Sequence, residues 1–242
     1  MRPAVRGSKN RTIVASQLPL ELAPEPSFAA EEFFVSISNE TAFTMIDFWP
    51  DWPDKFLHLL GPAGCGKSHL GAIWAERSGA KIVQASHLGE VELLELVEGG
   101  ALLVENAEQI GGAEAQLFHL MNLFRERAAS LVLTSRCRPD SWGLATADLL
   151  SRLRQAPCVE IGAPDDWLMR AVLVKLLIER QLVVNASVVE YVALHLDRSL
   201  DAARSFIDAL DREALARRSR ITRIMAAEVM ERMKGVAAEG GI

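Results

Sequence analysis

Cysteine is scarce in this chain of 242 residues, and its three occurrences, Cys65, Cys137 and Cys158, lie far apart. An odd, widely spaced set argues against a disulfide framework and against a zinc site with paired ligands. The five histidines also lack the spacing that a metal site needs. We therefore expect a chain that works in a reducing compartment, the cytoplasm.

The sequence also lacks a long apolar run and an excess of positive charge. No apolar stretch of signal-peptide or membrane-span length follows the basic residues of the first eleven positions, so we expect neither export nor membrane insertion. The net charge of -6 argues against a protein that mainly coats a phosphate backbone. The one basic cluster, Arg217–Arg223, is interpreted as a solvated turn between two helices, and a contact with DNA is the alternative. No helix-turn-helix unit follows Met233, so sequence-specific DNA binding is not expected.

Internal repeats, coiled-coil heptads and low-complexity tracts are absent, which excludes solenoid and fibrous architectures. With 50% hydrophobic and 24% charged residues, the composition is that of an ordinary globular protein. A chain of 242 residues is long enough for one substantial core and a smaller one. We therefore expect two packed units.

The first 27 residues contain four prolines, which cannot lie inside a helix or a central strand. This segment is predicted to be an extended arm. A helical or mixed segment follows over residues 29–46. The alternating prolines of residues 49–53 then predict a rigid surface loop, with Trp49 and Trp52 as its anchors.

Five short apolar runs recur after this loop, and stretches of helical periodicity separate them. The runs are Phe56–Leu60, Lys81–Ala85, Ala101–Val104, Leu131–Thr134 and Cys158–Ile161. The helical stretches include Lys67–Ser78, which Gly79 ends, and Glu114–Arg127. Alternation of this kind is typical of α/β proteins. We predict a five-stranded parallel sheet flanked by helices over residues 28–163.

After Pro164 the pattern changes to helical periodicity alone. Four stretches show it: Asp165–Gln181, Ser187–Leu196, Leu200–Arg217 and Thr222–Met233. No convincing strand lies between them. Residues 164–242 are therefore predicted to form a small, all-helical lid domain.

A phosphate-binding loop follows the first apolar run. Its spacing is G-x-x-x-x-G-K-S, and its residues are Gly61, Pro62, Ala63, Gly64, Cys65, Gly66, Lys67 and Ser68. The glycines let successive backbone N–H groups face the phosphates without a Cβ in the way, and the next helix adds its dipole. Lys67 is expected to reach the β and γ phosphates and Ser68 to ligate Mg²⁺. We predict that the loop binds ADP or ATP with Mg²⁺, the one metal we expect.

Glu105 ends the third apolar run and is the candidate for the acid that accompanies such a loop at the metal, the Walker B position. P-loop ATPases usually place Asp there, and many follow it with an acid that orients water, whereas Asn106 follows here. Glu108 is interpreted as a solvated residue at a helix start. We predict nucleotide binding with little or no hydrolysis by this chain alone.

From Trp49 to Met233 the order of features resembles the Hda/DnaA family of AAA+ proteins, and especially the Hda-type regulatory inactivators of DnaA. The carriers are GPAGCGKSHL at 61–70, LLVENAE at 102–108, LVLTSRCRP at 131–139 and LATADLLSRL at 144–153. The resemblance implies an AAA+ nucleotide-binding domain with a lid. It also implies that Arg152 is an arginine finger for a neighbouring protomer's nucleotide, a role worth about 10³–10⁵ in rate. From the residues alone, an ion pair at a helix end is the simpler interpretation of Arg152, and Arg154 is its rival.

The resemblance assigns further residues around the nucleotide in the sheet domain. His69, directly after the loop, is counted among the nucleotide-contacting residues. Arg136 stands at or beside the sensor-1 position, which is often acidic in initiators. Ser135 or Thr134 is the candidate for that role instead.

The lid arginine called sensor 2 has no clean counterpart. Asp201 falls near the expected place. Arg198 and Arg204, one helical turn before and after it, are the candidates.

The arm contains a second feature of the resemblance. The string from Gln17 to Leu22 resembles the Q-L-x-L-x-L peptide that binds the replication sliding clamp, the polymerase beta subunit, with Gln17, Leu18, Leu20 and Leu22 as the contacts. An extended, proline-containing segment loses less chain entropy when it docks. From the pattern alone, an arm packed on its own domain is an equal alternative.

The resemblance as a whole implies a negative regulator of DNA replication initiation. Such a protein binds the sliding clamp and adenine nucleotide, works in its ADP-bound form, and presents Arg152 to ATP held by DnaA. Association into a homodimer or larger oligomer is left open. Two alternatives remain: an autonomous AAA+ ATPase of the helicase-loader or clamp-loader type, and a pure tether to the clamp.

Overall fold

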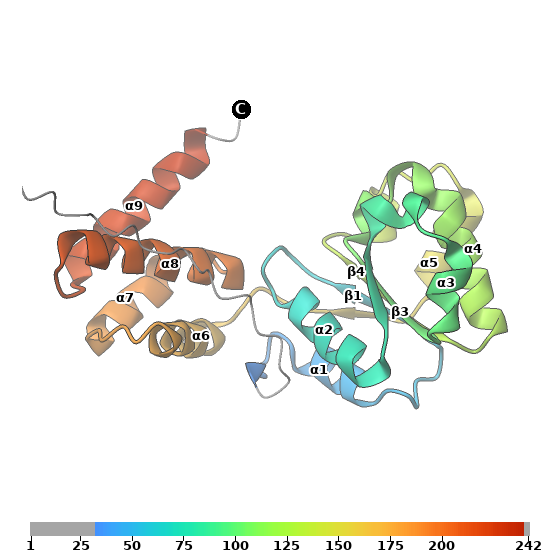
Figure 1. Ribbon diagram of the computed structural model, residues 1–242, viewed down its shortest axis with the longest axis horizontal. Helices are drawn as coiled ribbons and strands as arrows, with labels where there is room; N and C mark the ends of the chain where they lie inside the picture. Colours follow the sequence, from blue (N-terminus) through green and yellow to red (C-terminus); the bar gives the residue numbers. More distant parts are fainter. Residues whose placement is uncertain (1–31, 240–242) are drawn as a thin grey trace, which may run out of the picture.

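A computed structural model describes residues 32–239 of the chain, so the predicted clamp-binding residues 17–22 lie outside the described part. Five parallel strands form one sheet in the order β2-β3-β4-β1-β5. The central strands β3, β4 and β1 are labelled in Figure 1. Their bounds are β1 Phe56–Leu60, β2 Lys81–Gln84, β3 Ala101–Glu105, β4 Ser130–Ser135 and β5 Cys158–Glu160. The predicted five-stranded parallel sheet is confirmed.

Helices cover both faces of this sheet. On one face lie α1 Glu40–Asp47 and α2 Lys67–Ser78, and on the other lie α3 Leu93–Glu98, α4 Glu114–Glu126 and α5 Ala147–Gln155. Short 3-10 segments occupy Ala85–Glu90, Ala107–Gln109, Gly111–Ala113 and Pro139–Ser141.

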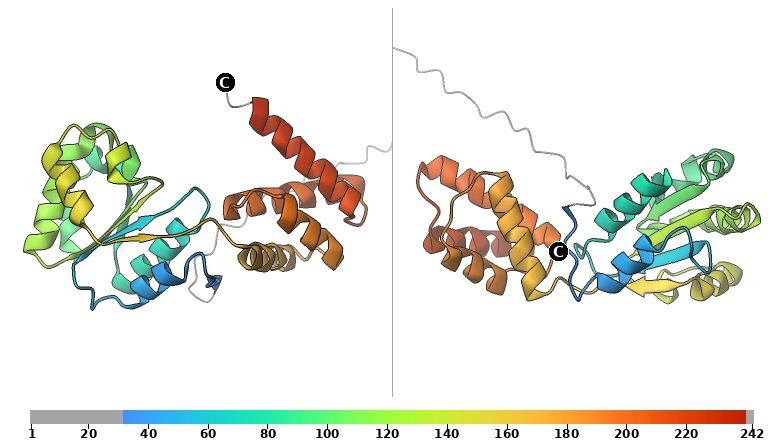
Figure 2. Two further views of the ribbon diagram at one scale, coloured as in Figure 1. Left: turned by 180° about the vertical axis from the view of Figure 1, so that it is seen from behind. Right: turned by 90° about the horizontal axis from the view of Figure 1, so that it is seen from below.

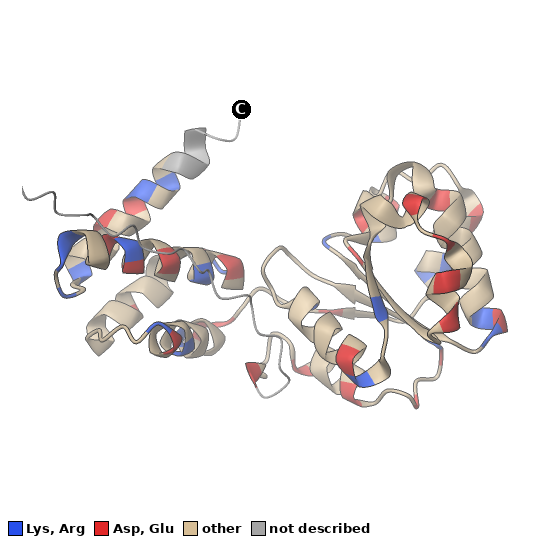
Figure 3. Cartoon of the chain, viewed as in Figure 1, with Lys and Arg blue, Asp and Glu red and all other residues tan. Residues whose placement is uncertain are grey.

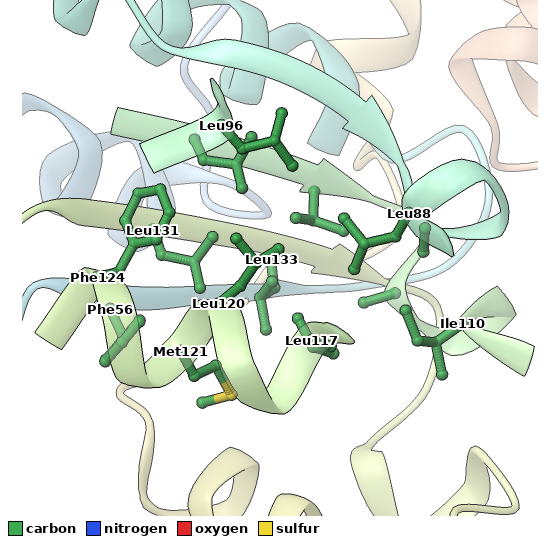
Figure 4. Close-up of a cluster of buried hydrophobic side chains, with 14 of the residues drawn as sticks. Phe56, Leu88, Leu96, Ile110, Leu117, Leu120, Met121, Phe124, Leu131 and Leu133 are labelled. Atoms are coloured by element: carbon green, nitrogen blue, oxygen red, sulfur yellow. The ribbon is translucent and has the colours of Figure 1, made fainter. Parts of the chain in front are cut away.

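Alternating side chains of the strands feed two separate hydrophobic clusters, because successive residues of a strand point to opposite faces. Leu131 and Leu133 of β4 pack with Leu117 and Phe124 of α4 (Figure 4). Val132, between them, belongs to the cluster on the α1–α2 face. The near-continuous apolar composition of the strands follows from this burial on both faces.

Four further helices enclose a hydrophobic core of their own. They are α6 Asp166–Glu179, α7 Ala186–His195, α8 Leu200–Arg217 and α9 Arg223–Glu239. Leu173, Val192, Phe206 and Val229 are buried between them. Side-chain caps begin three of the helices: Asp165 accepts from the Leu168 N–H, Asn185 from Ser187 and Ser199 from Ala202. The helical lid is thus present, with α9 running further than predicted.

The tryptophan-rich loop is anchored as expected. The Trp52 ring is buried and stacks on Trp74 of α2 at 5.9 Å between centroids. Trp49 meets the same ring edge-on at 6.3 Å and donates from Nε1 to Ser130 Oγ at 3.0 Å. The Trp49–Pro50 peptide bond is cis.

Charged side chains are scattered along both parts of the molecule, with acidic and basic residues interspersed (Figure 3). Within residues 32–239, none of the helices combines the length and apolar character that crossing a bilayer takes. The three cysteines are free: Cys65 is buried, Cys137 half-buried and Cys158 exposed.

Candidate functional site

The glycine-rich loop connects the carboxyl end of β1 to the first turn of α2. Gly64 and Gly66 adopt φ of 65° and 104°, a left-handed backbone that favours glycine. A Cβ on Gly61 would lie 2.4 Å from the Ile161 carbonyl oxygen. The glycines at these three positions are therefore required by conformation or by close approach, as the motif predicts for Gly61 and Gly66.

Lys67 is the buried cation of this loop, with only 7% of its surface exposed. Its Nζ donates to the carbonyl oxygens of Gly61 and Pro62, both at 2.7 Å. Among residues 32–239 it forms no ion pair. A buried ammonium without a counter-charge is costly, so this environment suits an incoming anion. Ser68 is exposed at the start of α2, where the helix dipole also favours negative charge.

Cys65 occupies a variable position of the loop and is buried. Burial raises the pKa of its thiol, and the nearby Lys67 ammonium opposes this effect. The side chain packs within the cluster of the α1–α2 face. Cys65 therefore acts as a small apolar side chain that fills space in this cluster.

The lid contacts the loop directly. The Leu200 N–H donates to the Gly64 carbonyl oxygen at 2.7 Å, and a Cβ on Gly64 would lie 2.0 Å from Ser199 Oγ. Beside this contact, a pocket of about 350 Å³ lies between α6, α8 and the segment that precedes α1. Phe33 and His69 line it and meet edge-on at 5.2 Å. The pocket thus adjoins the phosphate loop and is walled partly by rings and apolar side chains, as a nucleotide base requires.

Glu105 lies at the end of β3, across β4 from the loop, and is held by a neighbour on β2. Gln84 Nε2 donates to Glu105 Oε2 at 2.7 Å, and Asn106 Nδ2 donates to Gln84 Oε1 at 2.8 Å. The Asn106 backbone N–H donates to Thr134 Oγ1 at 3.1 Å. One amide side chain therefore connects both residues at which P-loop ATPases place catalytic acids.

The sensor-1 candidates are engaged in hydrogen bonds inside the protein. Ser135 is fully buried: its hydroxyl donates to the Cys137 carbonyl at 2.8 Å and lies 2.6 Å from His58 Nε2. Burial, followed by the charge of Arg138, lowers the pKa of His58 to about 4. The role of Ser135 at a nucleotide stays a prediction.

Arg136 and Glu108 form an ion pair on the neighbouring loops, with Nε and Oε1 3.6 Å apart. Only 13% of the Glu108 side chain is exposed. The expectation that Glu108 is solvated was wrong, because the fold brings Arg136 and its backbone N–H to that carboxylate.

Arg152 lies on α5, on the face of the sheet opposite α2. Its guanidinium is 4.6 Å from the centre of the Phe118 ring, and Nη1 donates to Asn122 Oδ1. It does not line the pocket beside the loop of its own chain. Arg154, two residues later, pairs instead with Asp140.

The two lid arginines differ in position. Arg204 lines the pocket. Arg198 pairs with Asp166 at the start of α6. Of the two sensor-2 candidates, the fold brings only Arg204 to the pocket. The backbone nitrogen of Asp201 would lie 3.2 Å from a Cβ on Gly64.

Sequence reasoning missed Phe33, Lys175 and Gln84. The first two line the pocket, and the third holds Glu105. Their partners are distant in sequence, so no local pattern marks them. A polar residue directly after the apolar pair Ile82 and Val83 was the one available signal for Gln84.

Comparison with known proteins gave structural matches only. No family model matches the chain, and no curated protein matches it. Domain III of the replication initiation protein DnaA from Thermotoga maritima superposes with a TM-score of 0.73 and 18% identity, over 86% of this chain and 97% of that one.

Two further matches are similar. AMPPCP-bound DnaA from Aquifex aeolicus has a TM-score of 0.65 and 18% identity, over 89% of this chain and 71% of that one. A RuvB mutant from Thermotoga maritima has a TM-score of 0.61 and 17% identity, over 80% and 67%. At such identities the likeness concerns the fold alone. The chain therefore has a DnaA-like AAA+ fold.

Proposed function

We propose that this chain binds ADP or ATP with Mg²⁺ at the loop 61–68 and in the pocket beside it. The buried Lys67 ammonium, which has no counter-charge among the described residues, is the observation that carries this proposal. Ser68 would ligate the metal and Lys67 the terminal phosphates. Phe33 and His69 would border the base or ribose. AMPPCP is bound in one DnaA structure of the same fold.

The proposed site holds nucleotide without turning it over efficiently. Asn106 stands where a catalytic acid would be needed, and it cannot accept a proton from water as a carboxylate does. Glu105, the weak Walker B candidate, is hydrogen bonded to Gln84. Both features favour bound nucleotide as a signal that sets the state of the protein, as in an ADP-bound regulator.

The proposed action is on a neighbour's nucleotide: Arg152 stabilises charge on the γ-phosphate of ATP held by DnaA, while Gln17–Leu22 bind the sliding clamp. Arg152 lies on the face of the sheet opposite α2 and does not line the pocket of its own chain. This position supports action in trans. Asn122 and Phe118 would orient the guanidinium before a partner arrives. The protein would thus be a negative regulator of replication initiation.

The first test measures nucleotide affinity by calorimetry with ADP and ATP in the presence of Mg²⁺. Lys67→Ala removes the phosphate ligand and is expected to abolish measurable binding. Lys81→Ala is the matched control, since Lys81 is an exposed lysine of β2. Binding that survives in Lys67→Ala, or that is absent from the well-folded wild type, would contradict the proposal.

The second test reconstitutes ATP-bound DnaA with DNA-loaded clamp and follows ATP hydrolysis. Arg152→Ala is expected to lower the stimulated rate by about 10³-fold. Arg154→Ala, which removes an exposed arginine of the same helix, should leave the rate near that of the wild type. An unchanged rate for Arg152→Ala removes the trans role. ATP turnover by the isolated chain, lost in Glu105→Gln, would favour an autonomous ATPase instead.

A further inference from the structure

Helix α6 carries two apolar stripes, and only one of them faces the lid core. Met169, Leu173 and Leu176 form the inner stripe and are buried. Trp167, Ala171, Val174 and Ile178 form the outer stripe, in which neighbours are three or four residues apart and share a face. Exposed fractions on this stripe reach 55% at Trp167 and 70% at Ile178. A helix that is apolar all round is normally covered all round.

The outer stripe is one wall of an open groove. The loop after α6 and the first turns of α7 form the other wall, which includes Val183, 90% exposed, and Val189. The groove has a volume of about 1000 Å³. A continuous exposed apolar surface of this kind marks a binding site.

The described chain begins at the rim of this groove. The Glu32 carboxylate lies 2.8 Å from Nζ of Lys175 on α6, and the Phe34 ring meets Trp167 edge-on at 6.2 Å. Figures 1 and 2 draw this first segment, in blue, between α6 and α1. The arm, residues 1–31, is therefore joined to the molecule beside the outer stripe.

The sequence of the arm matches the groove in chemistry and in length. Leu18, Leu20, Leu22 and Phe28 supply large apolar side chains. Ten residue steps from Leu22 to Glu32 can span up to about 33 Å, and α6 itself is only about 21 Å long. The three leucines can therefore reach any point along the outer stripe, and Phe28 can reach the part near the rim.

We infer that the α6–α7 groove binds the chain's own arm, through the apolar side chains between Leu18 and Phe28. Attachment at the rim gives this segment a far higher effective concentration at the groove than any free partner or second copy has. Its prolines reduce the entropy lost on docking. The docking is independent of the proposed function. One consequence does rest on that function: the same leucines cannot occupy the groove and a clamp at once.

A photo-crosslinking experiment on the full chain tests the docking, with neither clamp nor nucleotide present. Benzoylphenylalanine replaces Ile178 in the groove or, as the control, Leu194, which is 72% exposed on α7 but does not line the groove. An equal mixture of ¹⁵N-labelled and unlabelled chains is irradiated. Digestion after glutamate, which cuts at Glu21 and Glu31, then permits identification of the cross-linked peptides by mass spectrometry.

The expected result is a cross-link from position 178 to arm peptides of the same isotopic label, absent from position 194. Replacing Leu18, Leu20 and Leu22 by serine should reduce the yield to that of the control. Circular dichroism checks that each variant is folded. Cross-links between labels, to a second copy's arm or groove, would overturn docking in cis. Cross-links that avoid the arm, or a yield unaffected by the serine substitutions, would overturn the inference altogether.

Discussion

His58 is buried in the sheet and forms no ion pair within residues 32–239, and its protonation follows from its neighbours. The Ser135 hydroxyl donates to the Cys137 carbonyl, so it can only accept from His58 Nε2. The Trp142 ring meets the imidazole edge-on at 5.7 Å. Burial and the charge of Arg138 lower the pKa of His58 to about 4, so the folded protein keeps a neutral ring at pH 5.

This neutrality predicts a loss of stability in mild acid. Below pH 6.5 the unfolded chain binds a proton at His58, whereas the folded chain binds it only near pH 4. Lowering the pH therefore stabilises the unfolded state relative to the folded state. When the pH falls from 7 to 5, the protonation of His58 in the unfolded chain is expected to lower the free energy of unfolding by about 2 kcal/mol. Urea unfolding at both pH values should show a smaller decrease for His58→Gln than for the wild type. The exposed His87→Gln should keep the decrease of the wild type, and equal decreases for all three would contradict the pKa argument.

Elements were predictable wherever a local signal marks their ends. β1 and α2 begin and end as predicted, because Gly61 ends the apolar run and Gly79, with φ of 69°, caps the helix. The predicted end of α9 was too early, because the helix continues through Gly235 to Glu239 instead of ending at that glycine. Strand order could not be predicted, because it depends on contacts between distant segments.

The residues of the candidate site likewise fall into those that a local motif predicts and those that only the fold brings together. Lys67 and Ser68 were predictable because the motif is contiguous. The Gln84–Glu105 hydrogen bond joins residues on adjacent strands, and the pocket wall combines Phe33 with Lys175 from another part of the chain. Such pairs exist only after the sheet and the lid have packed.

At the scale of the whole molecule, the sheet domain and the helical lid meet at the phosphate loop. Gly64 lies at this meeting point, between the loop and the first residues of α8. It has a positive φ, and the space for a side chain is already filled by Ser199. The contact between the loop and the start of α8 therefore requires a residue without a Cβ at position 64.

Gly64→Ala is expected to weaken this contact. The left-handed backbone alone costs an alanine about 1–2 kcal/mol, and the Cβ would also clash with Ser199 Oγ. Gly143→Ala is the matched control, since Gly143 has φ of 72° and no atom within 4 Å of the added Cβ. Urea unfolding and ADP calorimetry should show a larger loss for Gly64→Ala. Adding Ser199→Gly should recover the difference, and equal losses for the two alanine variants would show that the clash has no effect.

The hydrogen bond from Leu200 to Gly64 also has a mechanical consequence. Leu200 is the first residue of α8, a helix of 18 residues that is about 27 Å long. A helix of this length transmits a tilt as a rigid rod, so a small shift of the loop carbonyl becomes a larger displacement at the far end, near Arg217. A fluorescent probe on the turn between α8 and α9 would thus report, at a distance, on what is bound at the phosphate loop.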